Sequence, residues 1–412
     1  MEILNKPLQI KDKKIIHDDD VKLTPKQIGA LLEKKLGAKN IQKSENQYLI
    51  KSRKIALLPK CCTWINKDGK RNDYRVERRR VQLSKKFPEH VVKNFEKGYT
   101  TYYLGIYCYE AERDFLYILF DTTQYAKKKS NNSAAQVTIY DLISAKTRGQ
   151  FFKYDKMGNR IYILNEKNFI DFILNEDSEV LKTAEMEYSL LQYLKDFWSD
   201  LPIELRGDLC YQEMFDEAYT NTFQGEWVGF YHEFSFQKYI EQNPTNLVSF
   251  HADKTQDGID LDLKINISEN FYGDLKSDNE DFDIQGNKKE TIDKVIAENG
   301  HIWYIVAAFN EVVMDKTMNY HVMKIYNSLK EEYNNNPVNK PKKKISMDYA
   351  EKMKYSAQFN HFYVLDINPG NIEYLSDYKQ GKNSDGSERK VKYKINKKTI
   401  EEFKIFEFKK SC

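Results

Sequence analysis

The chain has 412 residues, of which 41% are hydrophobic and 14% aromatic, and 65 Lys and Arg balance 62 Asp and Glu to a net charge of +3. This composition excludes disorder of the whole chain and predicts two or three globular domains. No run of 18 apolar residues occurs and no secretory signal pattern opens the sequence, so we expect a cytoplasmic protein that does not contact a membrane. Five cysteines without a CxxC spacing indicate neither a disulfide framework nor a zinc site.

The N-terminal part reads as a helix followed by strands. Residues 24–36, TPKQIGALLEKKL, have Thr24 as N-cap, Pro25 in the first turn and Gly37 after the end, which predicts a helix. From residue 55 to 120, β-branched and aromatic runs are separated by turn signals, and a hairpin is expected to turn at residues 157–159. We therefore expect a strand-rich N-terminal domain over residues 1–180.

The C-terminal part alternates helices and strands. Apolar residues at helical spacing predict helices over 184–199, 225–241 and 287–298, and the apolar run IWYIVAAF at 302–309 predicts a strand buried on both faces. Strand, helix and apolar strand together predict a βαβ crossover. The lysine-rich alternation RKVKYKINKK at 389–398 predicts a basic edge strand. Residues 181–412 are expected to form a mixed sheet flanked by helices, in an α/β (α+β) protein.

Charge is distributed unevenly along the chain. Residues 51–90 hold 13 Lys and Arg against 4 Asp and Glu, whereas residues 251–290 hold 5 Lys against 11 Asp and Glu. A basic and an acidic segment in a near-neutral chain predict one part that binds polyanions and another that binds cations. Two solvated faces of opposite sign are the alternative.

Acidic side chains recur on two neighbouring apolar runs in the acidic segment. Over residues 259–265 the apolar side chains fall on odd positions and the polar ones on even positions, as in a half-buried strand. If this run pairs as a hairpin with residues 271–276, Asp260, Asp274 and Lys276 meet. Two carboxylates about 4 Å apart would repel by roughly 4 kcal/mol at an effective dielectric near 20, so a cation is expected between them. Asp262 lies on the same face as Asp260 and is the alternative ligand.

These residues carry a resemblance to a known family. Asp260, followed after 13 residues by Asp274-Leu275-Lys276, resembles the D…(D/E)xK signature of the PD-(D/E)XK nuclease superfamily, to which many type II restriction endonucleases belong. The resemblance covers residues 205–330, with two departures: no proline precedes Asp260, and Asp274 stands where glutamate is commoner. It implies a Mg²⁺-dependent, sequence-specific endonuclease that hydrolyses double-stranded DNA.

The resemblance also implies roles for single residues. Asp260 and Asp274 would hold Mg²⁺, with Mn²⁺ as a substitute, because hard cations prefer oxygen ligands. Lys276 would orient or deprotonate the attacking water and contact the phosphate. Glu233, on the helix over 225–241, would complete the metal site, with an exposed helix carboxylate as an equal alternative.

Basic side chains supply the expected DNA contacts. Arginine makes bidentate contacts to guanine edges and to phosphates, and a second polar surface follows in SAKTRGQ. The candidate DNA-binding residues are Arg71, Arg75, Arg78, Arg79, Arg80, Lys146, Arg148 and Gln150.

Other partners and functions follow from the same reading. No phosphate-loop or dinucleotide motif is present, so no nucleotide cofactor is expected. A homodimer is expected because two strands must be cut. The alternative functions are a non-catalytic DNA-binding regulator with a degenerate nuclease fold, and a structure-specific repair or RNA nuclease.

Overall fold

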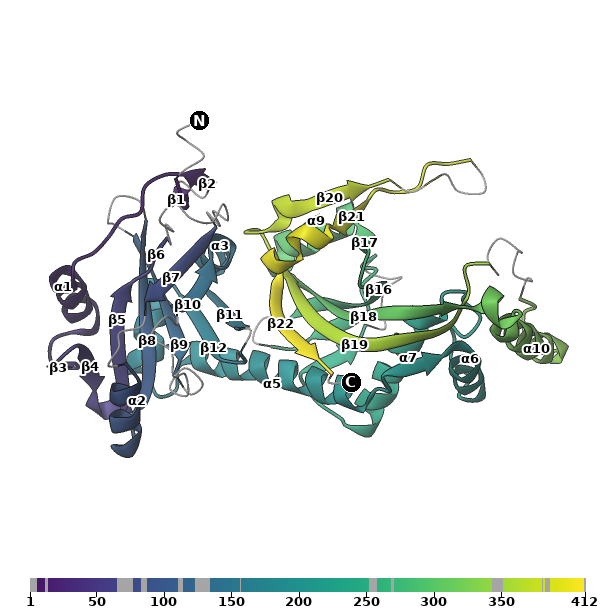
Figure 1. Ribbon diagram of the computed structural model, residues 1–412, viewed down its shortest axis with the longest axis horizontal. Helices are drawn as coiled ribbons and strands as arrows, with labels where there is room; N and C mark the ends of the chain where they lie inside the picture. The colour runs from purple at the N-terminus through teal and green to yellow at the C-terminus, as the bar shows by residue number, and fades with distance from the viewer. Residues whose placement is uncertain are drawn as a thin grey trace. The chain divides into compact units, whose positions relative to one another are not determined.

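The computed structural model describes residues 6–11, 14–64, 77–82, 87–109, 114–122, 134–155, 157–251, 258–267, 270–342, 351–379, 381 and 386–410. The chain divides into two compact units, Met1–Glu187 with Asn368–Glu373, and Tyr188–Ile367 with Tyr374–Cys412. Each combines helices with sheets (Figure 1), which confirms the mixed α/β (α+β) class. No helix in the described part of the chain is long and apolar enough to cross a membrane.

The first unit is built on a seven-stranded sheet with the order β11-β12-β9-β8-β5-β4-β3. Its central strands are almost continuously apolar because side chains on both faces are buried; Tyr117, for example, stacks on Phe169 of α4 with ring centroids 4.0 Å apart. Two small sheets, β10-β7-β6 and β1-β2, accompany it. The elements are β1 (Leu8–Lys11), β2 (Lys14–His17), α1 (Pro25–Leu36), β3 (Gln42–Ser44), β4 (Gln47–Ile50), β5 (Ile55–Cys61), β6 (Thr63–Trp64), β7 (Arg78–Gln82), α2 (Phe87–Glu96), β8 (Thr100–Tyr109), β9 (Asp114–Asp121), β10 (Ala134–Thr138), α3 (Ile139–Arg148), β11 (Gln150–Tyr154), β12 (Arg160–Leu164), α4 (Glu166–Leu174) and α5 (Glu179–Asp200), which continues into the second unit.

A short segment from late in the sequence completes the first unit. Residues Asn368–Glu373 pack on α3, where the Ser144 hydroxyl donates to Asn368 Oδ1 at 2.7 Å. Asn368 is fully buried. A Cβ atom on Gly370 would lie 2.7 Å from Ile143 Cγ2 and 2.9 Å from the Ser144 backbone nitrogen, so only glycine fits this contact.

The second unit is built on a mixed sheet with the order β13-β19-β18-β16-β15-β14, and β22 also pairs with β19. A separate three-stranded sheet has the order β17-β21-β20. One face of the large sheet is apolar and packs on α5, where Trp198 stacks on Phe362 and Phe406. The elements are β13 (Glu204–Arg206), α6 (Gly207–Asp216), α7 (Trp227–Gln242), β14 (Val248–Phe250), β15 (Leu263–Ile265), β16 (Phe271–Asn279), β17 (Ile284–Lys288), α9 (Lys289–Asn299), β18 (Ile302–Met314), α10 (His321–Asn335), β19 (Lys354–Ile367), β20 (Leu375–Tyr378), β21 (Lys392–Ile395) and β22 (Lys404–Lys409).

Most of the expected elements are present. Thr24 and Gln27 form the capping box of α1, with the Thr24 hydroxyl accepting from the Gln27 backbone nitrogen at 3.3 Å. The hairpin between β11 and β12 turns through Gly158, whose φ is 74°. β16, α9 and β18 form the predicted crossover, since β16 and β18 are parallel neighbours.

Two expectations are wrong. The basic strand β21 is not an edge strand, because β17 and β20 pair with it on opposite sides. The strand expected over 259–265 is shorter, since β15 begins only at Leu263. Ile259 and Leu261 are nevertheless buried, so the apolar side chains of this run are in the core outside the paired backbone as well.

Candidate active site

The hairpin of β15 and β16 brings two acids and a lysine together. Leu263 pairs with Gly273 in the antiparallel register, so Asp262, just before β15, lies beside Asp274. The Asp262 backbone nitrogen donates to Asp274 Oδ1 at 3.1 Å, and the Leu275 backbone nitrogen donates to Asp262 Oδ2 at 3.0 Å. The Lys276 ammonium forms an ion pair with Asp274 Oδ2. Each acid is thus held by the backbone beside the other, and we call Asp262, Asp274 and Lys276 the acid–lysine cluster.

Asp260 lies outside this cluster. Its side chain is 62% exposed and its Oδ2 atom is 3.7 Å from the Lys288 ammonium. The geometry therefore favours Asp262, the alternative ligand considered from the sequence, as the partner of Asp274. The reason is the start of β15: Asp262 directly precedes the first paired residue, Leu263, and its carbonyl accepts from the His251 backbone nitrogen at 2.8 Å, whereas Asp260 lies two residues further from the paired backbone.

Burial sets the electrostatics of the acid–lysine cluster. Burial and the neighbouring Asp262 raise the pKa of Asp274 well above its usual range, although the Lys276 ammonium opposes the shift. Burial alone would lower the pKa of Lys276, but Asp274 and the Tyr304 side chain raise it. Lys276 therefore keeps its proton at neutral pH, with its ammonium 5.3 Å from the centre of the Tyr304 ring.

Glu233 lies on α7 and contacts Tyr219, whose hydroxyl donates to Glu233 Oε2 at 3.3 Å. Burial and Glu233 raise the pKa of Tyr219, which also feels the charge of Asp262. His232, the neighbour of Glu233, is buried against Phe197, and burial lowers its pKa to about 4 despite Asp262. Tyr219, the partner of Glu233, thus lies within electrostatic reach of Asp262.

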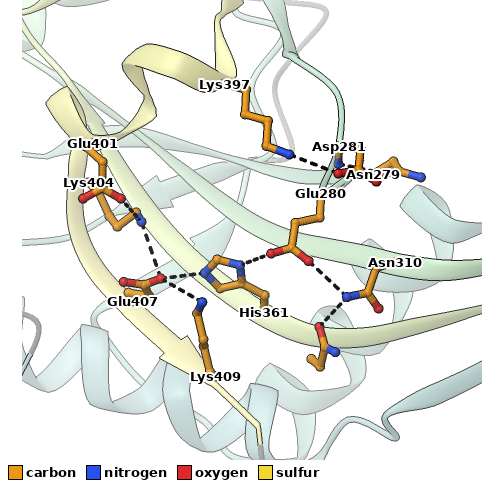
Figure 2. A network of polar contacts seen from close by, with 11 residues as sticks. Asn279, Glu280, Asp281, Asn310, His361, Lys397, Glu401, Lys404, Glu407 and Lys409 are labelled. Carbon is orange, nitrogen blue, oxygen red and sulfur yellow. Dashed lines mark hydrogen bonds and ion pairs between the residues drawn. The ribbon is translucent and has the colours of Figure 1, made fainter.

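Sequence reasoning missed Asp278, although it has the same parity on β16 as Asp274 and Lys276. Burial raises the pKa of Asp278 to about 6, against the opposing charges of Lys276 and Lys354. The next acid at this parity, Glu280, is engaged elsewhere, as Figure 2 shows: its carboxylate contacts His361 Nδ1 at 2.9 Å and accepts from the Asn310 amide at 3.0 Å. The sequence carried a signal for Asp278, because this residue has the same parity along the strand as Asp274.

The two carboxylates of the acid–lysine cluster offer oxygen ligands, the kind that a hard divalent cation prefers. Asp274 Oδ2 is buried and pairs with the Lys276 ammonium. Mg²⁺ is typically bound through one or two carboxylates and keeps several waters. No group of three or more His, Cys, Asp or Glu side chains suited to a metal occurs among the described residues. Asp262 and Asp274 are the two carboxylates of the cluster.

The arginines of the basic segment differ in how deeply they are buried. Arg79 is fully buried: its guanidinium donates to the Leu8 carbonyl and lies 3.5 Å from Asp20 Oδ1. It is therefore not available to DNA, contrary to expectation. Arg78 and Arg80 on the same strand are half-buried. Arg71 and Arg75 lie outside the described residues.

The second polar surface lies at the end of α3. Arg148 has an ion-pair distance of 3.9 Å to Glu187, and the Lys146 ammonium lies 4.5 Å from the centre of the Tyr109 ring. Gln150 begins β11 and accepts from the Asn168 amide at 3.4 Å. All three side chains are half-buried, so each combines a packing contact with partial access to solvent.

Comparison with known proteins gives one match. Residues 53–173 are similar to the family described as Methylase-associated X1 (MTaX1). The matched residues run from the end of the helical turn before β5 to α4, and they include Arg78, Arg80 and the end of α3. No curated protein and no solved structure matches the chain significantly.

Proposed function

We propose that the protein is a Mg²⁺-dependent endonuclease that cuts double-stranded DNA at specific sequences within a restriction-modification system. The observation that carries the proposal is the acid–lysine cluster, in which two interlocked carboxylates and a permanent cation share one edge of a hairpin. The similarity of residues 53–173 to a family named for its association with methylases supports the restriction-modification setting. Cleavage that must spare methylated host DNA is the activity that a methylase accompanies.

Asp262 and Asp274 would hold the metal in this proposal. A bound Mg²⁺ would neutralise charge on the scissile phosphate and make an attacking hydroxide available near neutral pH. The buried Asp274 Oδ2 would exchange its contact with the Lys276 ammonium for a contact with the cation. Glu233 and the Tyr219 hydroxyl would orient water at this position, since Tyr219 feels the charges of both Glu233 and Asp262.

The raised pKa of Lys276 narrows its role. An ammonium that keeps its proton at neutral pH is a poor proton acceptor, so Lys276 would contact the phosphate and stabilise its developing negative charge. This supports one of the two roles expected from the sequence, contact with the phosphate, over deprotonation of water.

The first unit would recognise DNA. We propose Arg78, Arg80, Lys146, Arg148 and Gln150 as contacts to bases or phosphates, because each is partly accessible. Two copies of the chain would cut the two strands.

The test is cleavage of unmethylated plasmid by the purified protein in Mg²⁺. Discrete fragments that EDTA abolishes are expected. A smear would indicate a nuclease without sequence preference, such as a repair or RNA nuclease acting on DNA, and an intact plasmid in both Mg²⁺ and Mn²⁺ with tight DNA binding would indicate a regulator. Either of these results overturns the proposal.

Variants assign the cutting to the acid–lysine cluster. Asp262→Asn, Asp274→Asn and Lys276→Met should each abolish cleavage and leave DNA binding in EDTA within a few-fold of wild type. Asp260→Asn is the matched control, because its carboxylate is exposed and outside the cluster. If Asp260→Asn is inactive and Asp262→Asn cuts normally, the ligand assignment is wrong.

A further inference from the structure

Two lysines face each other beside the acid–lysine cluster. Lys288, at the end of β17, is the antiparallel partner of Lys392, at the start of β21, after a register shift between Gln285 and Lys288. Side chains directly opposite on paired strands approach to about 4.5–5.5 Å between Cβ atoms, and like charges at such positions destabilise a sheet. A sheet that keeps two ammonium groups in register is best stabilised by an anion between them.

The neighbouring lysine on β21 shows the contrast. Lys394 forms an ion pair with Asp283 at 2.8 Å, whereas the Lys392 ammonium has no hydrogen bond or ion pair with the residues that the structure describes. Burial lowers the pKa of Lys392, and the positive charges of Lys276 and Lys288 lower it further. Asp260 and Asp274 act in the opposite direction, which places Lys392 within electrostatic reach of the acid–lysine cluster.

The start of α9 adds a third positive feature. Lys288 is the N-cap residue, and no side chain caps the helix there. Helix N-termini favour Ser, Thr, Asp or Asn at this position and carry a partial positive charge, so a lysine is unfavourable unless an anion binds. The helix has 11 residues, long enough for its dipole to contribute.

The other charged groups around this end of α9 already have partners. Lys289 pairs with Asp377 at 2.9 Å, and Glu290 pairs with Lys390 at 2.7 Å. The Tyr393 hydroxyl donates to Asp293 at 2.8 Å. Asp260, 3.7 Å from Lys288, is the one carboxylate with an ion-pair distance to either facing lysine among the described residues.

We propose that Lys288, Lys392 and the N-terminus of α9 form a binding site for a backbone phosphate of the nucleic acid strand. The site lies beside the acid–lysine cluster and would hold the strand at a phosphate near the one to be cut. The identity of the anion as a strand phosphate rests on the proposed endonuclease function; the affinity for an anion rests on the two lysines and the helix end alone.

The experiment measures DNA binding by the full-length protein in EDTA, where no cutting occurs. Fluorescence anisotropy of a labelled duplex is recorded over a range of salt for wild type, Lys392→Gln and Lys288→Gln. We expect each variant to bind several-fold more weakly, with the slope of log K against log salt smaller by about 0.9, the value for one lost phosphate contact. Unchanged affinity and slope in both variants overturn the proposal.

Lys394→Gln is the matched control, since it removes the same charge from the same strand but from a lysine with a carboxylate partner. It should bind DNA as wild type does and melt at a lower temperature. Lys392→Gln should melt at a higher temperature without DNA, because it relieves the repulsion from Lys288. Equal weakening of DNA binding by Lys394→Gln would mean that the pair has no special role.

A second measurement separates the sources of phosphate. Inorganic phosphate, added at constant ionic strength, should change the melting temperature little. If it stabilises wild type but not Lys392→Gln, while the two bind DNA equally, the site takes free phosphate and the strand assignment is wrong. An intact plasmid in the cleavage assay contradicts the endonuclease and leaves these binding results standing, so the two failures are distinguishable.

Discussion

Replacing Asp274 by asparagine should stabilise the second unit at neutral and alkaline pH, even though it removes a residue of the candidate active site. Asp274 is 2% exposed, and its neighbour Asp262 is 9% exposed. An asparagine keeps the shape and can still accept the hydrogen bond from the Asp262 backbone nitrogen. What it removes is a buried negative charge.

The magnitude follows from the charges around Asp274. Two carboxylates about 5 Å apart repel by about 3 kcal/mol at an effective dielectric of 20, and burial adds to this cost. The Lys276 ammonium offsets part of it, but the pKa of Asp274 stays well above its usual range, so burial and repulsion prevail. Because folding raises the pKa of Asp274, its charged form is disfavoured in the folded state, and we expect Asp274→Asn to raise the free energy of unfolding at pH 8.

The direction of the pKa shift of Asp274 determines how the stability difference between Asp274→Asn and wild type changes with pH. A carboxyl whose pKa is raised by folding contributes full stability below its unfolded pKa of about 3.9, and that stability is lost as pH rises through the folded pKa. The advantage of Asp274→Asn should therefore be small at pH 4 and grow toward pH 8. The proposed binding of Mg²⁺ would have the opposite effect on wild type, since saturation at 100 times the Kd would add about 2.7 kcal/mol, which the variant would not gain.

Urea denaturation followed by tryptophan fluorescence measures the effect, because the buried Trp198, Trp227 and Trp303 all report on the second unit. Asp260→Asn is the control and should stay within about 0.5 kcal/mol of wild type, since its side chain is exposed. A loss of stability on Asp274→Asn at pH 8, or an equal gain at pH 4 and pH 8, would refute the reasoning.

Three further predictions concern other parts of the chain. Arg79→Ala should destabilise the first unit by about 3–5 kcal/mol, because it leaves Asp20 buried without its cation. Arg80→Ala should instead weaken DNA binding with little effect on stability. Equal losses of stability in the two variants would contradict the different roles of these arginines. Gly370→Ala should cost about 1–3 kcal/mol in thermal denaturation, since its Cβ would meet Ile143 and the Ser144 backbone, and a neutral result would mean that the segment does not pack there. Hydrogen bonding to His361 and the charges of the nearby lysines lower the pKa of Glu407 to about 2. The contribution of Glu407 to stability is therefore present above about pH 4.5 and is lost as pH falls toward 2. We expect the stability of His361→Ala to fall less steeply than that of wild type over this pH range. An unchanged acid profile would show that this pair contributes nothing.

The sequence predicted the acid–lysine cluster in part. Period-two alternation depends only on neighbours along the chain, and it correctly placed Asp274 and Lys276 on one face of β16. The choice between Asp260 and Asp262 depended on where β15 begins to pair, which is decided by contacts with β14 and β16. The period-two alternation is the same for Asp260 and Asp262, so it does not distinguish between them.

Non-local contacts also account for the other differences. Arg79 lies in a run of arginines, and composition alone suggests a solvated cluster; its burial depends on Asp20 and the Leu8 carbonyl, far away in the sequence. The lysines of β21 suggested an exposed edge, but β17 and β20 both pair with that strand. Local patterns predicted which segments form strands, while partners distant in sequence determined their neighbours.

The passage of Asn368–Glu373 into the first unit limits how such a protein can diversify. The chain crosses between the units after Glu187, after Ile367 and after Glu373, so the first unit is discontinuous in the gene. A single recombination event that exchanged it as a cassette would leave α3 facing a foreign six-residue segment around Gly370, where no side chain fits. If the first unit recognises DNA as proposed, new sequence preferences should therefore arise by point substitution on a retained framework, and relatives that differ in preference should keep Ser144, Asn368 and Gly370 together as an inherited set.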